Sequence, residues 1–199
     1  MILKYGLLLV AYLIGAIPFS IILGKWIKGI DVRRHGSGNP GGTNSLRFLG
    51  GKVGALVIAG DISKGAIIVI LIRLGIFGDS DMLFHPLAYG FASAFGHAFS
   101  VFIKFRGGKA VGTTVGAMSA FNPLLSLISS IFFFGGLKIT KFVSIGSTSY
   151  AFGLIIIALV VQDYEMLLYV SLSALLIIYR HRSNYANIKN KVEPKITWM

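Results

Sequence analysis

The chain has 199 residues, of which 55% are hydrophobic and only 13% are charged, and its mean hydropathy is +0.78. A soluble domain has about a quarter of its residues charged, so this composition excludes a soluble globular protein and indicates a polytopic membrane protein. The sequence has no cysteine and only four histidines, which excludes disulfides and thiolate chemistry, and we expect neither a metal nor another cofactor.

Apolar stretches predict an all-α protein that spans the bilayer several times. About 20 apolar residues cross the hydrocarbon core as a helix. The sequence predicts such spans near residues 3–24, 53–77, 83–103, 143–162 and 165–180. The first stretch is too long for a cleavable signal sequence, so we interpret it as a retained span.

Residues 110–139 form a further apolar stretch that is too long for one span. As a single helix it would measure about 45 Å, and Asn122-Pro123 lies where a chain would turn. We therefore expect a short helix over 110–121 and a longer one over 123–139. The prediction is seven transmembrane helices, one of them short, in a single membrane-embedded domain over residues 1–199.

Charge predicts the orientation of these spans. Nineteen Lys and Arg outnumber seven Asp and Glu, for a net charge of +12. Successive connections between spans lie on alternate sides of the membrane. With seven spans, the basic stretches all lie on one side and the acidic residues lie on the other. The basic stretches are 25–52, 104–109, 138–141 and 180–195, and the acidic residues are Asp79, Asp81, Asp163 and Glu165. The positive-inside rule then places the N-terminus outside and the C-terminus in the cytoplasm. The basic residues are scattered among apolar segments, so the bilayer is a better partner than nucleic acid.

The first polar motif is GSGNPGGTNSLR, residues 36–47, which we expect to form a loop. Glycines allow backbone N–H groups to converge on an anion, and Arg47 can hold a phosphate with two parallel hydrogen bonds. Further donors are Ser37, Asn39, Thr43 and Asn44. A single glycine or serine here would fit a flexible linker equally well, but the whole run favours anion binding.

The second motif is GHAFSVFIKFRGGKAVGTT, residues 96–114. We expect Gly107, Gly108 and Lys109 to begin the short helix, where N–H groups and the helix dipole attract phosphate. The spacing of a P-loop is absent. A helix cap with an interfacial anchor is the alternative interpretation. In the second span, Asp61 and Lys64 are three residues apart and are predicted to pair.

The third motif is YRHRSNYANIKN, residues 179–190. His181 and Asn184 are three residues apart and would share one helical face, where they could bind the same ligand. The alternative is that these basic residues only hold the tail on the cytoplasmic side.

Together, the three motifs resemble those of the bacterial acylphosphate-dependent glycerol-3-phosphate acyltransferases of phospholipid synthesis, and the EPKITWM tail also fits. The resemblance implies transfer of an acyl group from acyl phosphate to the sn-1 hydroxyl of glycerol 3-phosphate, giving lysophosphatidic acid and phosphate. It also implies a multi-pass protein of the bacterial plasma membrane with its site on the cytoplasmic face. Contact with the enzyme that makes acyl phosphate is a further expectation.

The resemblance carries site residues over to this chain. Catalytic roles are expected for Ser37, Arg47, Lys104, His181 and Asn184. Binding of substrate phosphate is expected for Gly38, Asn39, Gly41, Thr43, Asn44, Gly107, Gly108, Lys109 and, as an addition outside the motifs, Ser144. The third motif runs NYANIKNKVE where the family more often has a glycine and an acidic residue, which leaves the role of Glu193 open.

An acyl phosphate is already activated, and the chain has neither a cysteine nor a G-x-S-x-G elbow. We therefore expect direct attack without a covalent acyl-enzyme, with Ser37 as a hydrogen-bonding group. The hydroxyl proton would go to the donor's phosphate or to His181. The other classes considered are a soluble-type acyltransferase that uses acyl-CoA or acyl carrier protein, and a transporter of phosphate or a lipid anion. The first is disfavoured because no H-x-x-x-x-D occurs, and the second because the polar motifs are predicted on one face.

Overall fold

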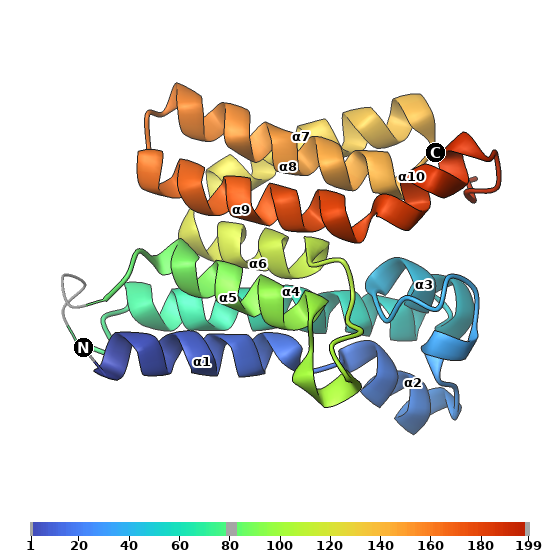
Figure 1. The fold of residues 1–199 in the computed structure, drawn as a ribbon, viewed down its shortest axis with the longest axis horizontal. Helices are drawn as coiled ribbons and strands as arrows, with labels where there is room; N and C mark the ends of the chain where they lie inside the picture. Colours follow the sequence, from blue (N-terminus) through green and yellow to red (C-terminus); the bar gives the residue numbers. More distant parts are fainter. Residues whose placement is uncertain (1, 79–82, 198–199) are drawn as a thin grey trace. The chain divides into compact units, whose positions relative to one another are not determined.

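The computed structural model describes residues 2–78 and 83–197, and all the regular secondary structure in these ranges is helical (Figure 1). Asp79 and Asp81 lie outside the described residues. Five helical segments are long and apolar enough to cross a membrane: Ile2–Lys28, Gly51–Arg73, Pro86–Ile103, Pro123–Thr140 and Val143–Val160. The all-α class is therefore confirmed, and the number of spans beyond these five stays a prediction.

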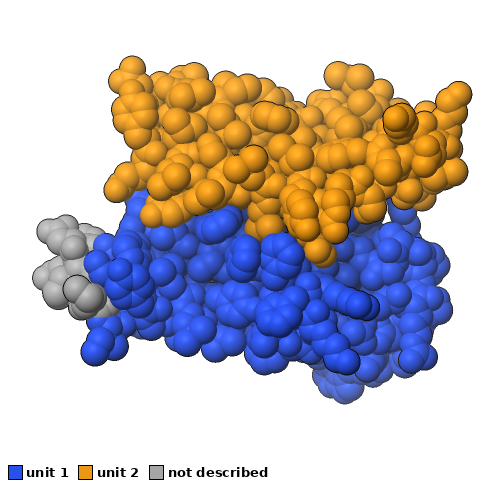
Figure 2. All heavy atoms as spheres, viewed as in Figure 1, with its two compact units in different colours: residues 1–121 blue, residues 122–199 orange. Residues whose placement is uncertain are grey.

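The chain divides into two compact units, residues 1–121 and 122–199 (Figure 2). Unit 1 contains four longer helices that lie side by side (Figure 1). They are α1 (Ile2–Ala16), α4 (Gly51–Arg73), α5 (Pro86–Ala98) and α6 (Val111–Phe121). Helix α5 packs on α1, and α6 packs on α4.

Glycines allow the helices of unit 1 to approach one another closely. In the α1–α5 pair, a Cβ added at Gly15 or Gly96 would overlap the backbone of the partner helix. In the α4–α6 pair, a Cβ added at Gly65 or Gly116 would do the same. Small residues at helix contacts are typical of membrane bundles, because lipid provides no hydrophobic force between helices and close packing must replace it.

Among the described residues, the connections of unit 1 contain four short elements. They are α2 (Phe19–Lys28), η1 (Val32–Arg34), α3 (Gly42–Leu49) and η3 (Val101–Ile103). The span predicted near residues 3–24 lies within the apolar segment Ile2–Lys28, and its helix is interrupted at Ile17 and Pro18. Proline has no N–H group and clashes with the carbonyl of the preceding turn, which explains the break.

The first motif was expected to be a loop as far as Arg47, and this was wrong. Helix α3 begins at Gly42, and the N–H of Ser45 donates to the carbonyl of Gly41 at 3.1 Å. Helix α3 packs on α4 at Gly54, where a Cβ would overlap the backbone of Leu46. Tertiary packing therefore turns the second half of a glycine-rich segment into a helix.

Unit 2 contains three long helices and a short one. They are α7 (Pro123–Thr140), α8 (Val143–Val160), α9 (Tyr164–Arg180) and α10 (Arg182–Lys189). The side chain of Asn122 accepts a hydrogen bond from the N–H of Leu125 at 3.2 Å and caps α7. This confirms the predicted division of residues 110–139 at Asn122-Pro123, and the bounds of α6 and α7 agree with the prediction to within one residue.

Candidate active site

The side chain of Asn44 organises the loop of the first motif. It is 4% exposed, and its amide donates to the carbonyls of Val32 at 3.1 Å and His35 at 3.0 Å. Its oxygen accepts from the N–H of Ser37 at 3.3 Å. The N–H of Gly38 donates a hydrogen bond to the carbonyl of His35. Gly38 has a φ of +68°, so the turn needs a residue that tolerates the left-handed region.

This loop leaves its polar groups exposed beside the first turn of α3. Ser37 is exposed, and its hydroxyl accepts a hydrogen bond from the N–H of Asn39 at 3.4 Å. Thr43 and Arg47 are exposed on α3 itself. The N–H groups of a first helical turn have no partner within the helix, so this surface offers backbone, hydroxyl and guanidinium donors together.

A second arginine near the loop is already engaged. The Arg33 guanidinium forms an ion pair of 2.6 Å with Asp31, which also caps η1 through the N–H of Arg33. The side-chain hydrogen bond from Arg33 lowers the pKa of Asp31 to about 2. Arg47 has no such partner among the described residues, so it is the better placed of the two for an anionic ligand.

The second motif is folded tightly onto the end of α5. The N–H of Gly107 donates to the carbonyl of Ala98 at 3.1 Å. The N–H of Gly108 donates to the backbone carbonyl of His97 at 3.0 Å. These residues precede α6 rather than begin it, because the helix starts at Val111. The two glycine N–H groups therefore point into the protein, and their expected role in binding phosphate stays a prediction.

Two cationic side chains flank this double-glycine segment. Lys104 is exposed and Lys109 is half-buried. Lys104, Phe105 and Ala110 all have φ values between 55° and 63°, a region that L-residues adopt rarely and at a cost. Such conformations persist only where the surrounding structure fixes them, so the path from residue 104 to residue 110 is strongly constrained.

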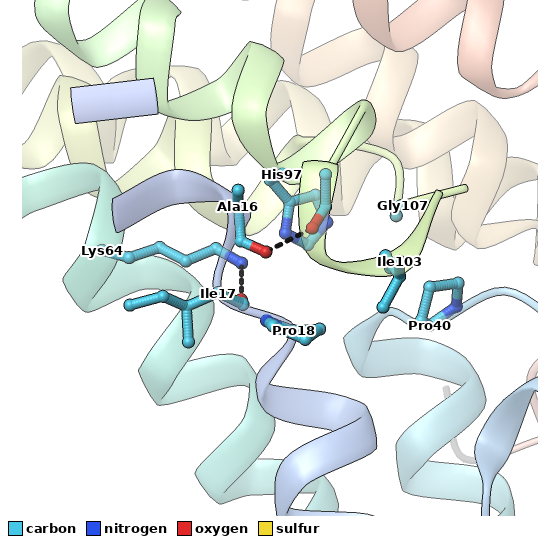
Figure 3. Close-up of a pocket in the computed structure, with 10 residues that line it drawn as sticks. Ala16, Ile17, Pro18, Pro40, Lys64, His97, Ile103 and Gly107 are labelled. Atoms are coloured by element: carbon cyan, nitrogen blue, oxygen red, sulfur yellow. Dashed lines mark hydrogen bonds between the residues drawn. The ribbon is translucent and has the colours of Figure 1, made fainter. Parts of the chain in front are cut away.

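The first and second motifs meet around one pocket of unit 1 (Figure 3). Pro40 of the first motif faces Ile103, Gly107 and Gly108 of the second. The remaining lining residues are Ala16, Ile17, Pro18, Lys64, His97 and Ser100. Segments about sixty residues apart in the sequence thus share a small pocket beside the break between α1 and α2.

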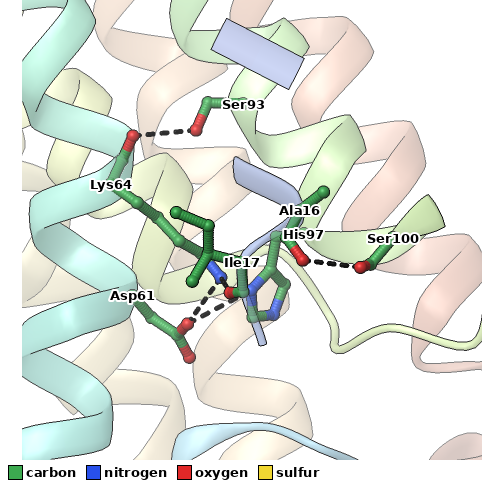
Figure 4. A network of polar contacts seen from close by, with 7 residues as sticks. All are labelled: Ala16, Ile17, Asp61, Lys64, Ser93, His97 and Ser100. Carbon is green, nitrogen blue, oxygen red and sulfur yellow. Dashed lines mark hydrogen bonds and ion pairs between the residues drawn. The ribbon is translucent and has the colours of Figure 1, made fainter. Parts of the chain in front are cut away.

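Two of these lining residues, Lys64 and His97, belong to a buried ionic network (Figure 4). A carboxylate oxygen of Asp61 lies 2.8 Å from the Lys64 ammonium and 3.3 Å from Nδ1 of His97. The predicted pair of Asp61 and Lys64 is confirmed. The sequence did not reveal His97 as its third member, because no local spacing connects residues 61 and 97.

In unit 2, His181 joins α9 to α10 and is 3% exposed. Its Nδ1 lies 2.8 Å from the carbonyl oxygen of Ile177. A carbonyl only accepts, so Nδ1 carries the proton, and Nε2 is the acceptor of the neutral ring. The ring centroid of Tyr185 lies 6.2 Å away.

Asn184 and Ser144 lie close to the same region of unit 2. Asn184 donates to Glu193 at 2.6 Å. The carbonyl of Ser144 accepts from Thr148, whose hydroxyl also pairs with that of Tyr185 at 2.5 Å. The Ser144 hydroxyl is buried without a hydrogen-bond partner in the described part of the chain. His181 and Asn184 therefore lie at the start of α10, and Thr148, one turn after Ser144 on α8, contacts α10 through Tyr185.

The fold and these segments define a class: an all-helical membrane protein whose polar, cationic segments lie at helix ends. The family described as "Glycerol-3-phosphate acyltransferase" matches residues 5–191. The chain belongs to this family and is an acyltransferase, as the resemblance predicted.

Its relatives are similar over nearly their whole length. The glycerol-3-phosphate acyltransferase of Bacillus subtilis (strain 168) is 45% identical over 97% of both chains. That of Bacillus velezensis is 47% identical over 96% of this chain and 97% of its own. The crystal structure of PlsY (YgiH), an integral membrane glycerol 3-phosphate acyltransferase, in its glycerol 3-phosphate form has a TM-score of 0.87 at 34% identity and covers 98% of this chain and 96% of that one. A second form of that protein, with lysophosphatidic acid, has a TM-score of 0.86 at 34% identity, with coverage of 98% and 95%.

Proposed function

We propose that this enzyme transfers a fatty acyl group from acyl phosphate to the sn-1 hydroxyl of glycerol 3-phosphate, giving lysophosphatidic acid and phosphate. The observation that carries the proposal is the group of exposed donors in the first motif, where Ser37, Thr43 and Arg47 lie in or beside the first turns of α3. The structures of a relative in forms with glycerol 3-phosphate and with lysophosphatidic acid support this choice of acceptor and product.

In the proposed reaction the glycerol hydroxyl attacks the carbonyl carbon of the acyl phosphate directly. A carbon–oxygen bond forms, the bond from the carbonyl carbon to the phosphate oxygen breaks, and phosphate leaves with the electron pair. Both substrates are anions, so catalysis depends on charge compensation and positioning. Arg47, Lys104 and Lys109 supply the cations, and Ser37 positions a substrate through hydrogen bonds.

We assign the hydroxyl proton to an oxygen of the departing phosphate. His181 is the alternative acceptor, because the hydrogen bond of its Nδ1 to Ile177 leaves Nε2 able to take a proton. In our preferred scheme, His181, Asn184 and Ser144 of unit 2 bind phosphate. In unit 1, the loop from Gly38 to Gly41 and the first turn of α3 do the same.

The proposal includes the arrangement in the membrane. We propose seven spans in one domain, with the N-terminus outside, the C-terminus in the cytoplasm and the active site on the cytoplasmic face of the bacterial plasma membrane. Helices α6 and α9, with 11 and 17 residues, are the shorter spans in this scheme. Contact with the enzyme that makes acyl phosphate would bring the reactive donor to that face.

A turnover assay tests the proposal. Purified protein in detergent receives acyl phosphate and glycerol 3-phosphate, and both phosphate release and lysolipid are measured, with acyl-CoA in a parallel reaction. We expect equal amounts of the two products with acyl phosphate only. Turnover with acyl-CoA would show that the enzyme belongs with the acyltransferases that use acyl-CoA or acyl carrier protein as the donor. Absence of turnover together with phosphate uptake into proteoliposomes would replace the enzyme assignment by transport.

Two variants test the chemistry. Ser37→Ala should slow the reaction without changing its products, and quenching the wild-type reaction should trap no acylated protein. An acyl group found on Ser37 would contradict direct attack. His181→Gln should lower activity at every pH if His181 binds phosphate. A pH–rate profile that loses its rise with pH in His181→Gln, while the wild-type profile keeps it, would instead identify His181 as the base.

A further inference from the structure

We infer that Asp61, Lys64 and His97 form a positioning network that holds the Gly107–Gly108 backbone, and with it Lys104 and Lys109, in the geometry that the reaction uses. The inference rests on the proposed function only for its effect on KM for glycerol 3-phosphate. Its structural consequence, a backbone that depends on these three buried side chains, can be measured separately.

The network is costly to maintain where it lies. The side chains of Asp61, Lys64 and His97 are 7%, 3% and 6% exposed, and two of them belong to the apolar helix α4. Ionisable groups in a membrane span are expensive, and apolar residues that fill the same space often stabilise a protein at least as well as a buried ion pair. Stability alone therefore does not account for three ionisable side chains at this position.

His97 connects the network to the second motif through direct contact. Its ring faces Asp61 with Nδ1, while its backbone carbonyl accepts the N–H of Gly108. A Cβ added at Gly108 would overlap Nε2 of the same ring, and one at Gly107 would overlap the carbonyl oxygen of His97. Both glycines are thus packed against His97 without space for any side chain, so a shift of His97 would displace them.

Lys64 anchors the other end of the network at the break in the first span. Its ammonium donates to the carbonyl of Ile17 at 2.9 Å, and Ser100 donates to the adjacent carbonyl of Ala16 at 2.5 Å (Figure 4). Carbonyls freed by a helix break in a membrane need replacement partners. The network therefore joins the α1–α2 break, α4 and α5 around the pocket that Gly107 and Gly108 line.

The packing of His97 against Gly108 permits a test in which one substitution rescues another. Asn at residue 97 retains a nitrogen donor close to the Nδ1 position but lacks the ring atoms that a Cβ at Gly108 would meet. Leu at 97 retains bulk but loses the donor to Asp61. The proteins to compare are His97→Asn, His97→Leu, Gly108→Ala and the double variant His97→Asn with Gly108→Ala. Gly135→Ala is the matched control, because no atom lies within 4 Å of a Cβ at that site.

Hydrogen exchange and steady-state kinetics are measured on each protein in detergent. We expect His97→Leu to speed exchange in a peptide covering residues 104–110 and to raise KM for glycerol 3-phosphate about tenfold, a change typical of losing one positioned contact. His97→Asn should raise KM less than His97→Leu does, because it keeps a donor to Asp61. Gly108→Ala should behave like His97→Leu, and the double variant should recover most of the wild-type KM and exchange protection.

Two results would overturn the inference. One is unchanged exchange at 104–110 in His97→Leu, and the other is a Gly108→Ala defect that His97→Asn does not relieve. A fall in melting temperature with unchanged KM, kcat and local exchange would show a structural role only. If the wild-type protein lacks acyltransferase activity, the proposed function fails, while the exchange comparison still decides whether the network holds the segment.

Discussion

Glu193 accepts a hydrogen bond of 2.6 Å from the side-chain amide of Asn184, although nine residues separate them in the sequence. Its second carboxylate oxygen accepts from Asn187 at 3.4 Å. The carboxylate thus lies beside α10 and fixes the rotamer of a residue expected to act in catalysis. Although the third motif departs from the common pattern of the family, its acidic residue Glu193 has a definite structural partner in Asn184.

We predict that Glu193→Ala lowers kcat/KM about tenfold, because loss of a hydrogen bond to a charged group costs roughly 1.5–3 kcal/mol and frees the Asn184 side chain. The melting temperature should change little, since Glu193 is half-buried at the surface. Steady-state kinetics with Glu193→Gln and Lys189→Ala alongside would check this. Glu193→Gln retains an acceptor and should be intermediate. Equal activity in Glu193→Ala and the exposed control Lys189→Ala would show that Asn184 needs no such support.

Local sequence patterns were sufficient for the long helices and for contacts within them. The apolar run over residues 110–139 and the Asn122-Pro123 turn defined α6 and α7, because both features act over a few residues. The pair of Asp61 and Lys64 followed in the same way from one turn of helix.

Local sequence patterns could not predict contacts between segments that are distant in the sequence. Helix α3 forms in a segment rich in glycine because it packs on α4, and His97 reaches Asp61 only because α5 lies beside α4. The break at Pro18 was locally visible, but an apolar run continues on both sides of it and hides the interruption from a hydropathy criterion.

We predict that Asn44→Asp destabilises the protein and lowers its activity more than tenfold. Asn44 donates to two backbone carbonyls, and a carboxylate at that position would have no donor for them. Leaving buried polar groups unsatisfied costs about 1–3 kcal/mol, and the loop that carries Ser37 would lose its shape. Thermal unfolding in detergent and turnover are the measurements, with the exposed Asn190→Asp as control. Wild-type behaviour of Asn44→Asp would show that the loop does not depend on this side chain.

We predict that Arg47→Lys raises KM for glycerol 3-phosphate about tenfold with little effect on stability. Lysine keeps the charge but cannot form the two parallel hydrogen bonds by which a guanidinium holds phosphate. Arg47 is exposed, so its replacement leaves no buried cavity. Initial rates at varied glycerol 3-phosphate are compared with those of Arg34→Lys, a control from the same loop region. If both variants keep the wild-type KM, the guanidinium of Arg47 has no phosphate contact to lose.

The final prediction concerns the pH dependence of the loop before the first motif. The hydrogen bond from Arg33 lowers the pKa of Asp31 from 3.8 to about 2. A carboxyl group whose pKa is lowered by folding contributes stability above its unfolded pKa, and this contribution disappears as the pH falls toward the folded pKa. The melting temperature of wild type should therefore exceed that of Asp31→Asn by a constant amount from pH 5 to pH 8. The difference should shrink between about pH 4 and pH 2.

The size of this difference is limited by solvent. The Arg33 side chain is 40% exposed, so we expect the pair to contribute less than about 1 kcal/mol, as exposed ion pairs do. Arg33→Gln should reduce the melting temperature by a similar amount, and adding Asp31→Asn to it should have little further effect, because each variant removes the same interaction. Fully additive losses in the double variant would show that Asp31 and the Arg33 guanidinium stabilise the turn independently of each other.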